Sequence, residues 1–312
     1  MIGPAQQGFS LLELLVSLAI AAIASALVLP GLLDFQAHTL AEIQRDELHK
    51  RAARLLRYLV ADLQETALQV GPEPKTAAGG PPILVHDSLA GDPAESFSSS
   101  LRPEPGAADE HDALTILTAV SFAPPIFLTQ PTAAGGTTLA LDRRPNRAPG
   151  SSREIQPSPE AIDHVVLPGH RTCYRVTGDD QSLPLAAGLL QTVPAGTEVM
   201  GVRARRYELQ SASGTNRLYR DDFTRRDILD HAVDGLQFEY LLQDDTLVDQ
   251  PDRPAEVRGI RISLLVRSRH ADRDFVDRNS YRLGDRTYGP YHDHFRRTRV
   301  SRMVEIINHG LP

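Results

Sequence analysis

The first thirty residues constrain this chain more than any other segment. An almost unbroken apolar run begins at Phe9, ends at Pro30 and contains a single acid, Glu13. A run of about 20 apolar residues is long enough to cross the hydrocarbon core of a bilayer as a helix. An ionised carboxylate at the bilayer centre costs on the order of 2.5–3.5 kcal/mol, so an acid in such a segment indicates a function.

The arrangement of Gly8, Phe9 and Glu13 before this run resembles the N-terminal motif of type IV prepilins and of the related pseudopilins of type II secretion. The resemblance implies that a prepilin peptidase cuts after Gly8 and that the new N-terminal Phe9 is N-methylated. Glu13 is then the fifth residue after the cut (13 − 8 = 5), and Pro30 is the twenty-second (30 − 8 = 22). We expect both residues to serve assembly, Pro30 by loosening the helix.

One departure concerns the segment before the cut. Met1–Gln7 contains no Lys or Arg, whereas leaders of this family usually carry one. The positive-inside rule therefore gives little information on orientation here.

An ordinary signal anchor is the alternative interpretation of the same run. Its small residues Ala21, Ala22, Ala24 and Ala26 are compatible with an apolar region followed by a cleavage site. However, the run is longer than that of a cleaved signal peptide, and a signal peptide does not explain Glu13. The prepilin interpretation is therefore favoured.

Composition excludes several other classes of protein. The chain has 312 residues and a net charge of −7, which argues against nucleic-acid binding by bulk electrostatics. Cys173 is the only cysteine, so no intramolecular disulfide can form. Because Cys173 lies in an apolar segment, we expect it to be a buried small hydrophobic residue.

Beyond Pro30 the pattern becomes amphipathic, with apolar residues along one helical stripe from Leu40 to Ala67. Gly71 and Pro72 are then expected to stop the helix, which we predict from Phe9 to about Val70. The predicted organisation is a leader at 1–8, a transmembrane helix at 9–33, its amphipathic continuation at 34–70, and a β-rich domain with Pro/Gly-rich loops at 71–312.

Alternation of apolar and polar residues predicts an antiparallel sheet in the C-terminal half. The predicted strands are Ile83–His86, Asp112–Val120, Thr137–Leu141, Ile162–Leu167, Thr172–Thr177, Val202–Gln210, Leu218–Arg220, Leu236–Leu242, Val257–Ser268 and Thr298–Ile307. The segments Val233–Tyr240 and Val257–Ser268, with Asp112–Ile116 after the long helix, resemble PilW-type minor pilins. J-type pseudopilins share a similar layout.

No motif of a known enzyme class is present: the chain lacks a P-loop, GxSxG, HExxH and CxxC. We therefore expect no enzymatic activity, no cofactor and no metal site. Three groups have both a functional and a simpler interpretation. They are His292-Asp293-His294 as metal ligands against a polar loop, Asp244, Asp245, Asp249 and Asp252 as calcium ligands against a solvated hairpin loop, and Arg203, Arg205, Arg206 and Tyr207 as phosphate contacts against a charged outer strand face.

These patterns predict an α+β, pilin-like fold in which a long N-terminal helix packs on an antiparallel sheet. The resemblance implies a non-enzymatic minor pilin of a type IV pilus, placed in a tip or priming complex. The alternatives are a type II secretion pseudopilin and a tip-located adhesin or DNA-uptake module.

The resemblance also implies partners and a location. The partners are the prepilin peptidase, other minor pilins and the major pilin (or pseudopilins), the inner-membrane assembly platform and the membrane itself. Nucleic acid is not expected as a partner. The chain would cross the inner membrane once with its C-terminal domain in the periplasm, before it joins an extracellular pilus or a periplasmic pseudopilus.

Overall fold

The computed structural model divides the chain into two compact units, residues 1–50 and residues 51–312. It describes residues 11–71, 73–76, 83–85, 95–106, 111–142, 164–170, 172–177, 182–212, 215–223 and 225–306. Within these ranges, the side chains of residues 12–13, 27–34, 36–38, 40, 75, 84–85, 95 and 212 are not described.

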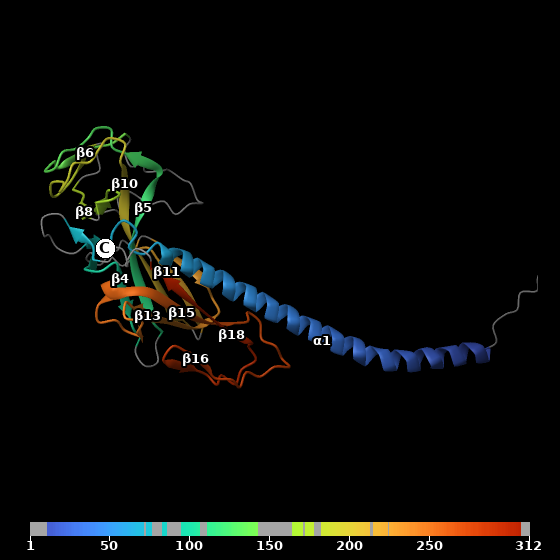
Figure 1. The fold of residues 1–312 in the computed structure, drawn as a ribbon. Coiled ribbons are helices and arrows are strands. Elements are labelled where there is room, and N and C mark those ends of the chain that lie inside the picture. Colours follow the sequence, from blue (N-terminus) through green and yellow to red (C-terminus); the bar gives the residue numbers. More distant parts are fainter. Residues whose placement is uncertain are drawn as a thin grey trace, which may run out of the picture. The chain divides into compact units, whose positions relative to one another are not determined.

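Helix α1 extends from Leu11 to Gln64 and includes Pro30 without a break (Figure 1). It ends earlier than the predicted Val70. Ala67 and Gln69 have positive φ angles of 60° and 58°, and the N–H of Ala67 donates to the carbonyl oxygen of Leu117 at 2.9 Å. Because this N–H bonds to a strand and not to the preceding helical turn, the helix cannot continue through it.

An eight-stranded sheet contains the two longest strands of residues 51–312, β5 and β10, which pair antiparallel and lie side by side (Figure 1). The order is β1-β8-β7-β10-β11-β12, with β5 on β10 and β4 on β5. The β1–β8 pair is parallel, which differs from the expected purely antiparallel pairing. The strands are β1 Lys75–Thr76, β4 Leu101–Glu104, β5 Ala113–Phe127, β7 His164–Val166, β8 Thr172–Arg175, β10 Glu198–Ala212, β11 Thr215–Asp221 and β12 Arg226–Asp230.

A four-stranded antiparallel sheet has the order β14-β13-β15-β18. The predicted alternation is confirmed in part on β15: Ile260, Ile262 and Leu264 are buried and Arg261 is partly exposed. Ser263 and Leu265, on the side of Arg261, are also buried, so this side of the strand is not fully wet. The strands are β13 Val233–Leu242, β14 Leu247–Val248, β15 Val257–Arg267 and β18 Arg297–Glu305, and the short 3-10 helix η3 Pro254–Glu256 precedes β15.

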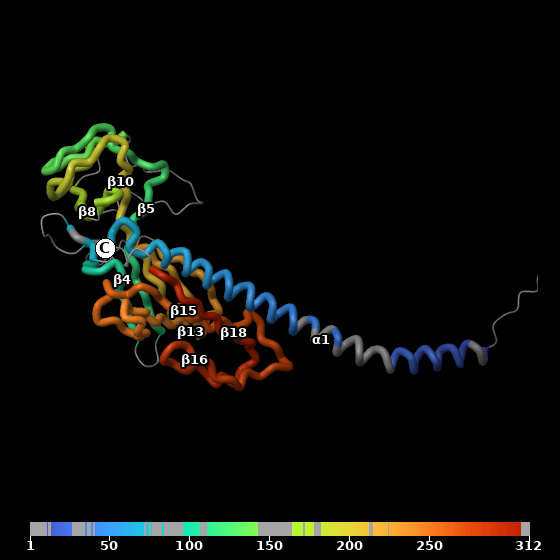
Figure 2. Tube along the Cα trace, viewed as in Figure 1, coloured from blue at the N-terminus to red at the C-terminus, as the bar shows by residue number. Residues whose placement is uncertain are grey.

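Three small strand pairs complete the description. They are β2 Ile83–Val85 with β3 Glu95–Phe97, β6 Thr138–Ala140 with β9 Ser182–Pro184, and β16 Tyr281–Leu283 with β17 Arg286–Tyr288. The β16–β17 hairpin belongs to the chain segment that connects β15 to β18 (Figure 2).

The apolar core among the described residues of the larger unit includes the following two clusters. One surrounds the end of β5 and the start of β10, where Ile126, Tyr174 and Val199 pack together. The other includes Leu117 and the free thiol of Cys173, which is buried as predicted. Burial raises the pKa of Cys173 to about 12, so its thiol stays protonated at neutral pH.

Candidate functional site

The residues singled out at the N-terminus lie largely outside the described part of the chain. Gly8 and Phe9 belong to residues 1–10, which are not described. Glu13 and Pro30 lie within α1, but their side chains are not described. Their roles in cleavage, methylation and assembly therefore remain predictions.

The described side chains at the start of α1 form an apolar surface that is exposed in the isolated chain. Their exposed fractions range from 51% for Val16 to 80% for Leu11. An exposed apolar surface of this extent marks a site of contact with another protein or with lipid. The residues are Leu11, Leu14, Leu15, Val16, Leu18, Ile20 and Ile23.

The predicted membrane span, residues 9–33, overlaps this surface. Among the described residues, no helix combines the length and the apolar character that a membrane crossing requires.

The last turns of α1, from Arg51 onward, have the opposite character. Leu55, Leu59 and Leu63 are buried in the larger unit. The guanidinium of Arg51 is also buried: Nε donates to Asp230 Oδ2 at 2.6 Å, Nη2 donates to Asp230 Oδ1, and Nη2 and Nη1 also reach the carbonyl oxygens of Ala232 and Arg267. This bidentate pair fixes the helix on the chain segment that joins β12 to β13.

A second polar contact lies three turns further along the helix, at Asp62. Its Oδ1 accepts from Arg205 Nη1 at 3.0 Å, and its Oδ2 lies 3.0 Å from Arg220 Nε and accepts from the hydroxyl of Tyr207. Arg220 also donates from Nη1 to the hydroxyl of Tyr58 at 2.9 Å. Burial, and then the nearby Asp62 carboxylate, raise the pKa of Tyr207 well above its ordinary value, so the phenol remains a hydrogen-bond donor.

This contact corrects the expectation for Arg203–Tyr207. The segment is not a charged outer strand face, because the side chains of Arg203, Arg205 and Tyr207 are largely buried. Their side chains contact other residues of the same chain. Arg203 Nη1 lies 3.7 Å from Asp222 Oδ2, and Arg206 Nη2 lies 2.7 Å from Glu104 Oε2.

A third polar cluster surrounds Arg297 at the start of β18. This side chain is 1% exposed and pairs with three carboxylates from separate segments, Asp234, Asp277 and Asp293, at 2.6, 3.0 and 2.7 Å. Its guanidinium also lies over the ring of Tyr291 at 3.5 Å. Hydrogen bonding from Arg297 lowers the pKa of Asp293, whereas burial raises the pKa of Asp234.

The Arg297 cluster accounts for one of the sequence candidates, His292-Asp293-His294. Asp293 is the partner of Arg297, and His294 Nδ1 lies 2.7 Å from the carbonyl oxygen of Phe275. Within the described residues, no group of three or more His, Cys, Asp or Glu side chains is arranged to hold a metal ion. In the acidic loop, Asp245 pairs with Arg258, and Asp244 accepts from the N–H of Thr246 at 3.0 Å.

Sequence reasoning missed the residues that carry these contacts, notably Asp62, Asp230 and Arg297. The signal for Asp62 is an acid on the otherwise apolar side of a helix, one residue before Leu63. No comparable signal marks Asp230, because its partner Arg51 lies 179 residues away in the sequence.

Two protein families match segments of this chain, one near each end. Residues 3–29 match the prokaryotic N-terminal methylation motif, and residues 228–308 match the family of type IV pilus-assembly protein W. Among solved structures, the type IV-like pilin TTHA1219 from Thermus thermophilus is similar, with 12% identity and a TM-score of 0.39 over 84% of this chain and 98% of that one. The comparison with curated proteins finds no match.

Proposed function

We propose that this chain, which its two family matches identify as a PilW-type minor pilin, is cut between Gly8 and Phe9 and then joins a type IV pilus through α1. The observation that carries the proposal is the methylation motif at residues 3–29 on the same chain as the match to the pilus-assembly family at residues 228–308. The exposed apolar surface at the start of α1 supports it, because such a surface requires lipid or neighbouring helices.

The proposed path begins in the inner membrane. Residues 9–33 cross the bilayer once, and the domain formed by later residues lies in the periplasm. A prepilin peptidase removes residues 1–8 and the amino group of Phe9 is methylated. The subunit then leaves the membrane when the assembly platform inserts its helix among those of other pilins.

Glu13 provides the register in this proposal. In the apolar interior of the fibre its carboxylate faces the N-terminal ammonium of Phe9 on a neighbouring subunit. Such a pair adds little net stability, but loss of one partner leaves a buried charge unpaired, which costs on the order of 3–5 kcal/mol. A subunit in the wrong register is therefore rejected.

The subunit has a structural and not a catalytic role, and we place it in a tip or priming complex. The larger unit, residues 51–312, is the support for this position, because a bulky domain would crowd a repeating fibre. Its partners there are other minor pilins and the major pilin.

Intact-mass analysis tests the first step. Protein from cells that contain the peptidase should have lost residues 1–8 and gained one methyl group, whereas protein from cells without it should begin at Met1. Gly8→Val should prevent the cut, because the side chain occupies the cleavage position, and Gly3→Val is the matched control that should be processed normally. An N-terminus at Met1 in both kinds of cell would overturn the proposal.

A further inference from the structure

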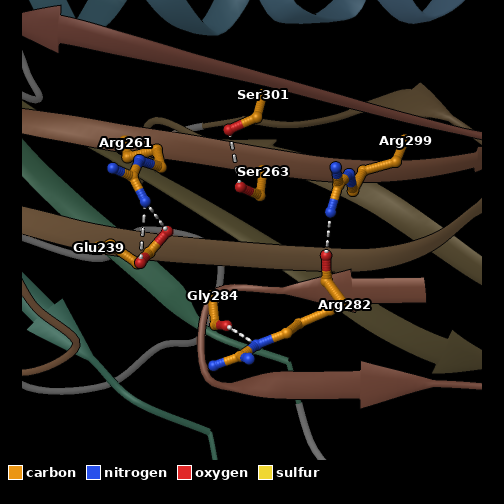
Figure 3. Close-up of a pocket in the computed structure, with 7 residues that line it drawn as sticks. All are labelled: Glu239, Arg261, Ser263, Arg282, Gly284, Arg299 and Ser301. Carbon is orange, nitrogen blue, oxygen red and sulfur yellow. Dashed lines mark hydrogen bonds and ion pairs between the residues drawn. The ribbon is translucent and has the colours of Figure 1, made fainter.

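The outer face of the four-stranded sheet carries a polar groove, which we call the β13–β18 groove (Figure 3). Strands β13, β15 and β18 form its floor, and the β16–β17 hairpin forms one wall. Its volume is about 410 Å³. The side chains that matter for its chemistry are Glu239, Arg261, Ser263, Arg282, Arg299 and Ser301.

The strand register explains why these side chains meet. Glu239 lies opposite Arg261, and Ser263 lies opposite Ser301 in the antiparallel ladder. Because side chains alternate between the two faces of a sheet, residues 261 and 263, and likewise 299 and 301, point to the same side. The groove is therefore built on paired strands and does not depend on loop conformation alone.

The hairpin wall is held close to the sheet. A Cβ atom at Gly235 would lie 3.2 Å from side-chain atoms of Leu265, Leu283 and Tyr288, so a larger residue would have to displace these neighbours by a few tenths of an ångström. Leu283 of β16 is buried, and Gln237 Nε2 donates to the hydroxyl of Tyr288 at 3.1 Å. The wall is therefore already in place before any ligand binds.

The charges in the groove are unbalanced. Among the lining side chains, three guanidinium groups accompany one carboxylate, an excess of two positive charges (3 − 1 = 2), in a chain whose net charge is −7. The Asp249 carboxylate lies beside Gly284 but is not part of the lining. Arg261 Nη1 contacts both oxygens of Glu239 at 3.3 Å, whereas Arg299 Nη1 and Arg282 Nε donate to the backbone oxygens of Arg282 and Gly284. These backbone bonds orient two guanidinium groups without neutralising them.

The remaining donors define the ligand. Each guanidinium has five N–H donors in a planar fork that matches a carboxylate or a phosphate. The hydroxyls of Ser263 and Ser301 lie 3.0 Å apart and bond to each other, so the pair adds at most one further donor. Glu239 in the same groove repels a doubly charged phosphate more strongly than a singly charged carboxylate. The groove volume accommodates one or two side chains and not a folded element.

We propose that the β13–β18 groove binds carboxylate side chains of an acidic segment on a neighbouring pilus subunit, with Arg282 and Arg299 as the principal contacts. This assignment rests on the proposed function for the identity of the partner. The binding chemistry itself belongs to the groove and is testable without a fibre.

The test measures binding of a fluorescein-labelled hexaglutamate peptide to the full chain in detergent, by fluorescence anisotropy at low salt. The double variant Arg282→Gln, Arg299→Gln should weaken binding by about tenfold or more, because two exposed charges that face the ligand are lost. Arg302→Gln is the matched control. It removes the same charge from an exposed residue of β18 that points to the opposite face, and should change affinity by less than about twofold.

Three results would overturn the proposal. They are failure of the wild-type chain to bind the peptide, an equal loss of binding in Arg302→Gln and in the double variant, and tighter binding of a phosphorylated peptide of equal charge than of hexaglutamate. The single variant Arg282→Gln provides a second test if the double variant misfolds, and it should lose at least about threefold. An unprocessed N-terminus in cells would overturn the proposed function but would leave peptide binding unchanged, so the two failures are distinguishable.

Discussion

The start of α1, from Leu11 to Ile23, and its last turns, from Arg51 to Gln64, are both helical but differ in burial. In the first, Leu14, Leu18 and Ile20 are 58–63% exposed. In the second, Leu55, Leu59 and Leu63 are at most 8% exposed. The comparison extends to charges, because Lys50 pairs with Asp46 at the surface, whereas its neighbour Arg51 pairs with Asp230 in the interior.

This difference in burial indicates that α1 has two separable roles. The second part is already satisfied within one chain, since its leucines and its buried charges have partners. The start of the helix, from Leu11 to Ile23, is apolar without being covered, so its stable environment must come from outside the chain. Substitutions in the two parts should therefore affect different measurements.

The largest expected effect is the loss of assembly when Glu13 is replaced. Glu13→Ala should reduce the amount of the subunit that co-purifies with sheared pili by at least about tenfold, because it leaves the ammonium of a neighbouring Phe9 unpaired in an apolar core. Glu13→Gln should behave similarly, since it keeps size but not charge. Membrane fractionation should be unchanged, and Glu47→Ala, at an exposed acid further along α1, is the control that should assemble normally. Assembly of Glu13→Ala at the wild-type level would contradict the register role.

The next largest effect concerns the stability of the larger unit. Asp230→Ala should lower the free energy of unfolding by about 3–5 kcal/mol, because it leaves the Arg51 guanidinium buried without its carboxylate. Asp46→Ala, which breaks the exposed pair with Lys50, should cost less than about 1 kcal/mol. Urea unfolding of the full chain in detergent measures both. Equal losses for the two variants would show that burial does not separate the two parts of α1.

A third effect compares a buried and an exposed leucine of α1. Leu59→Ala should lower the free energy of unfolding by about 2–5 kcal/mol, because the side chain is fully buried and its removal leaves a cavity. Leu18→Ala removes the same atoms from a residue that is 61% exposed and should leave unfolding of the larger unit unchanged. If Leu18→Ala destabilised that unit as much as Leu59→Ala, the two tasks would not be separable.

The smallest effect is a pH dependence confined to the larger unit. Burial, and then the charge of Arg286, lower the pKa of His111 from 6.5 to about 4, and its ring stacks on that of Tyr288. Between pH 6.5 and 4 the unfolded chain therefore binds a proton that the folded chain does not, so stability falls as the pH falls. Taking its partial exposure into account, His111 should contribute about 1 kcal/mol to the loss between pH 7 and pH 5. Thermal unfolding at both pH values should show a smaller loss for His111→Gln than for wild type, and an equal loss would exclude His111 as the cause.

Local patterns predicted much of the fold. The alternation in Leu236–Leu242 and Val257–Ser268 identified β13 and β15, because one side of each strand must be apolar when it covers a core. The predicted strands Val202–Gln210 and Leu218–Arg220 likewise lie within β10 and β11, which pair antiparallel. These features are encoded within a few residues of one another, so a sequence is sufficient to find them.

Contacts between distant segments were not predictable in this way. The end of α1 depends on a hydrogen bond from Ala67 to Leu117, and the burial of Arg205 depends on Asp62, 143 residues away. Residues 261, 282 and 299 form one groove only because β16–β17 folds back on the sheet. An arginine at a strand position has the same appearance in the sequence whether it faces solvent, a helix or a groove.

The Arg297 cluster has a consequence for where this protein can fold. With Cys173 as its only cysteine, the chain cannot close its C-terminal loop by a disulfide, and Arg297 instead links β18 to Asp234, Asp277 and Asp293. An ionic link of this kind needs no oxidant and is not broken by thiols. The loop therefore closes equally well in a reducing and in an oxidising compartment, and this closure does not depend on disulfide-forming enzymes.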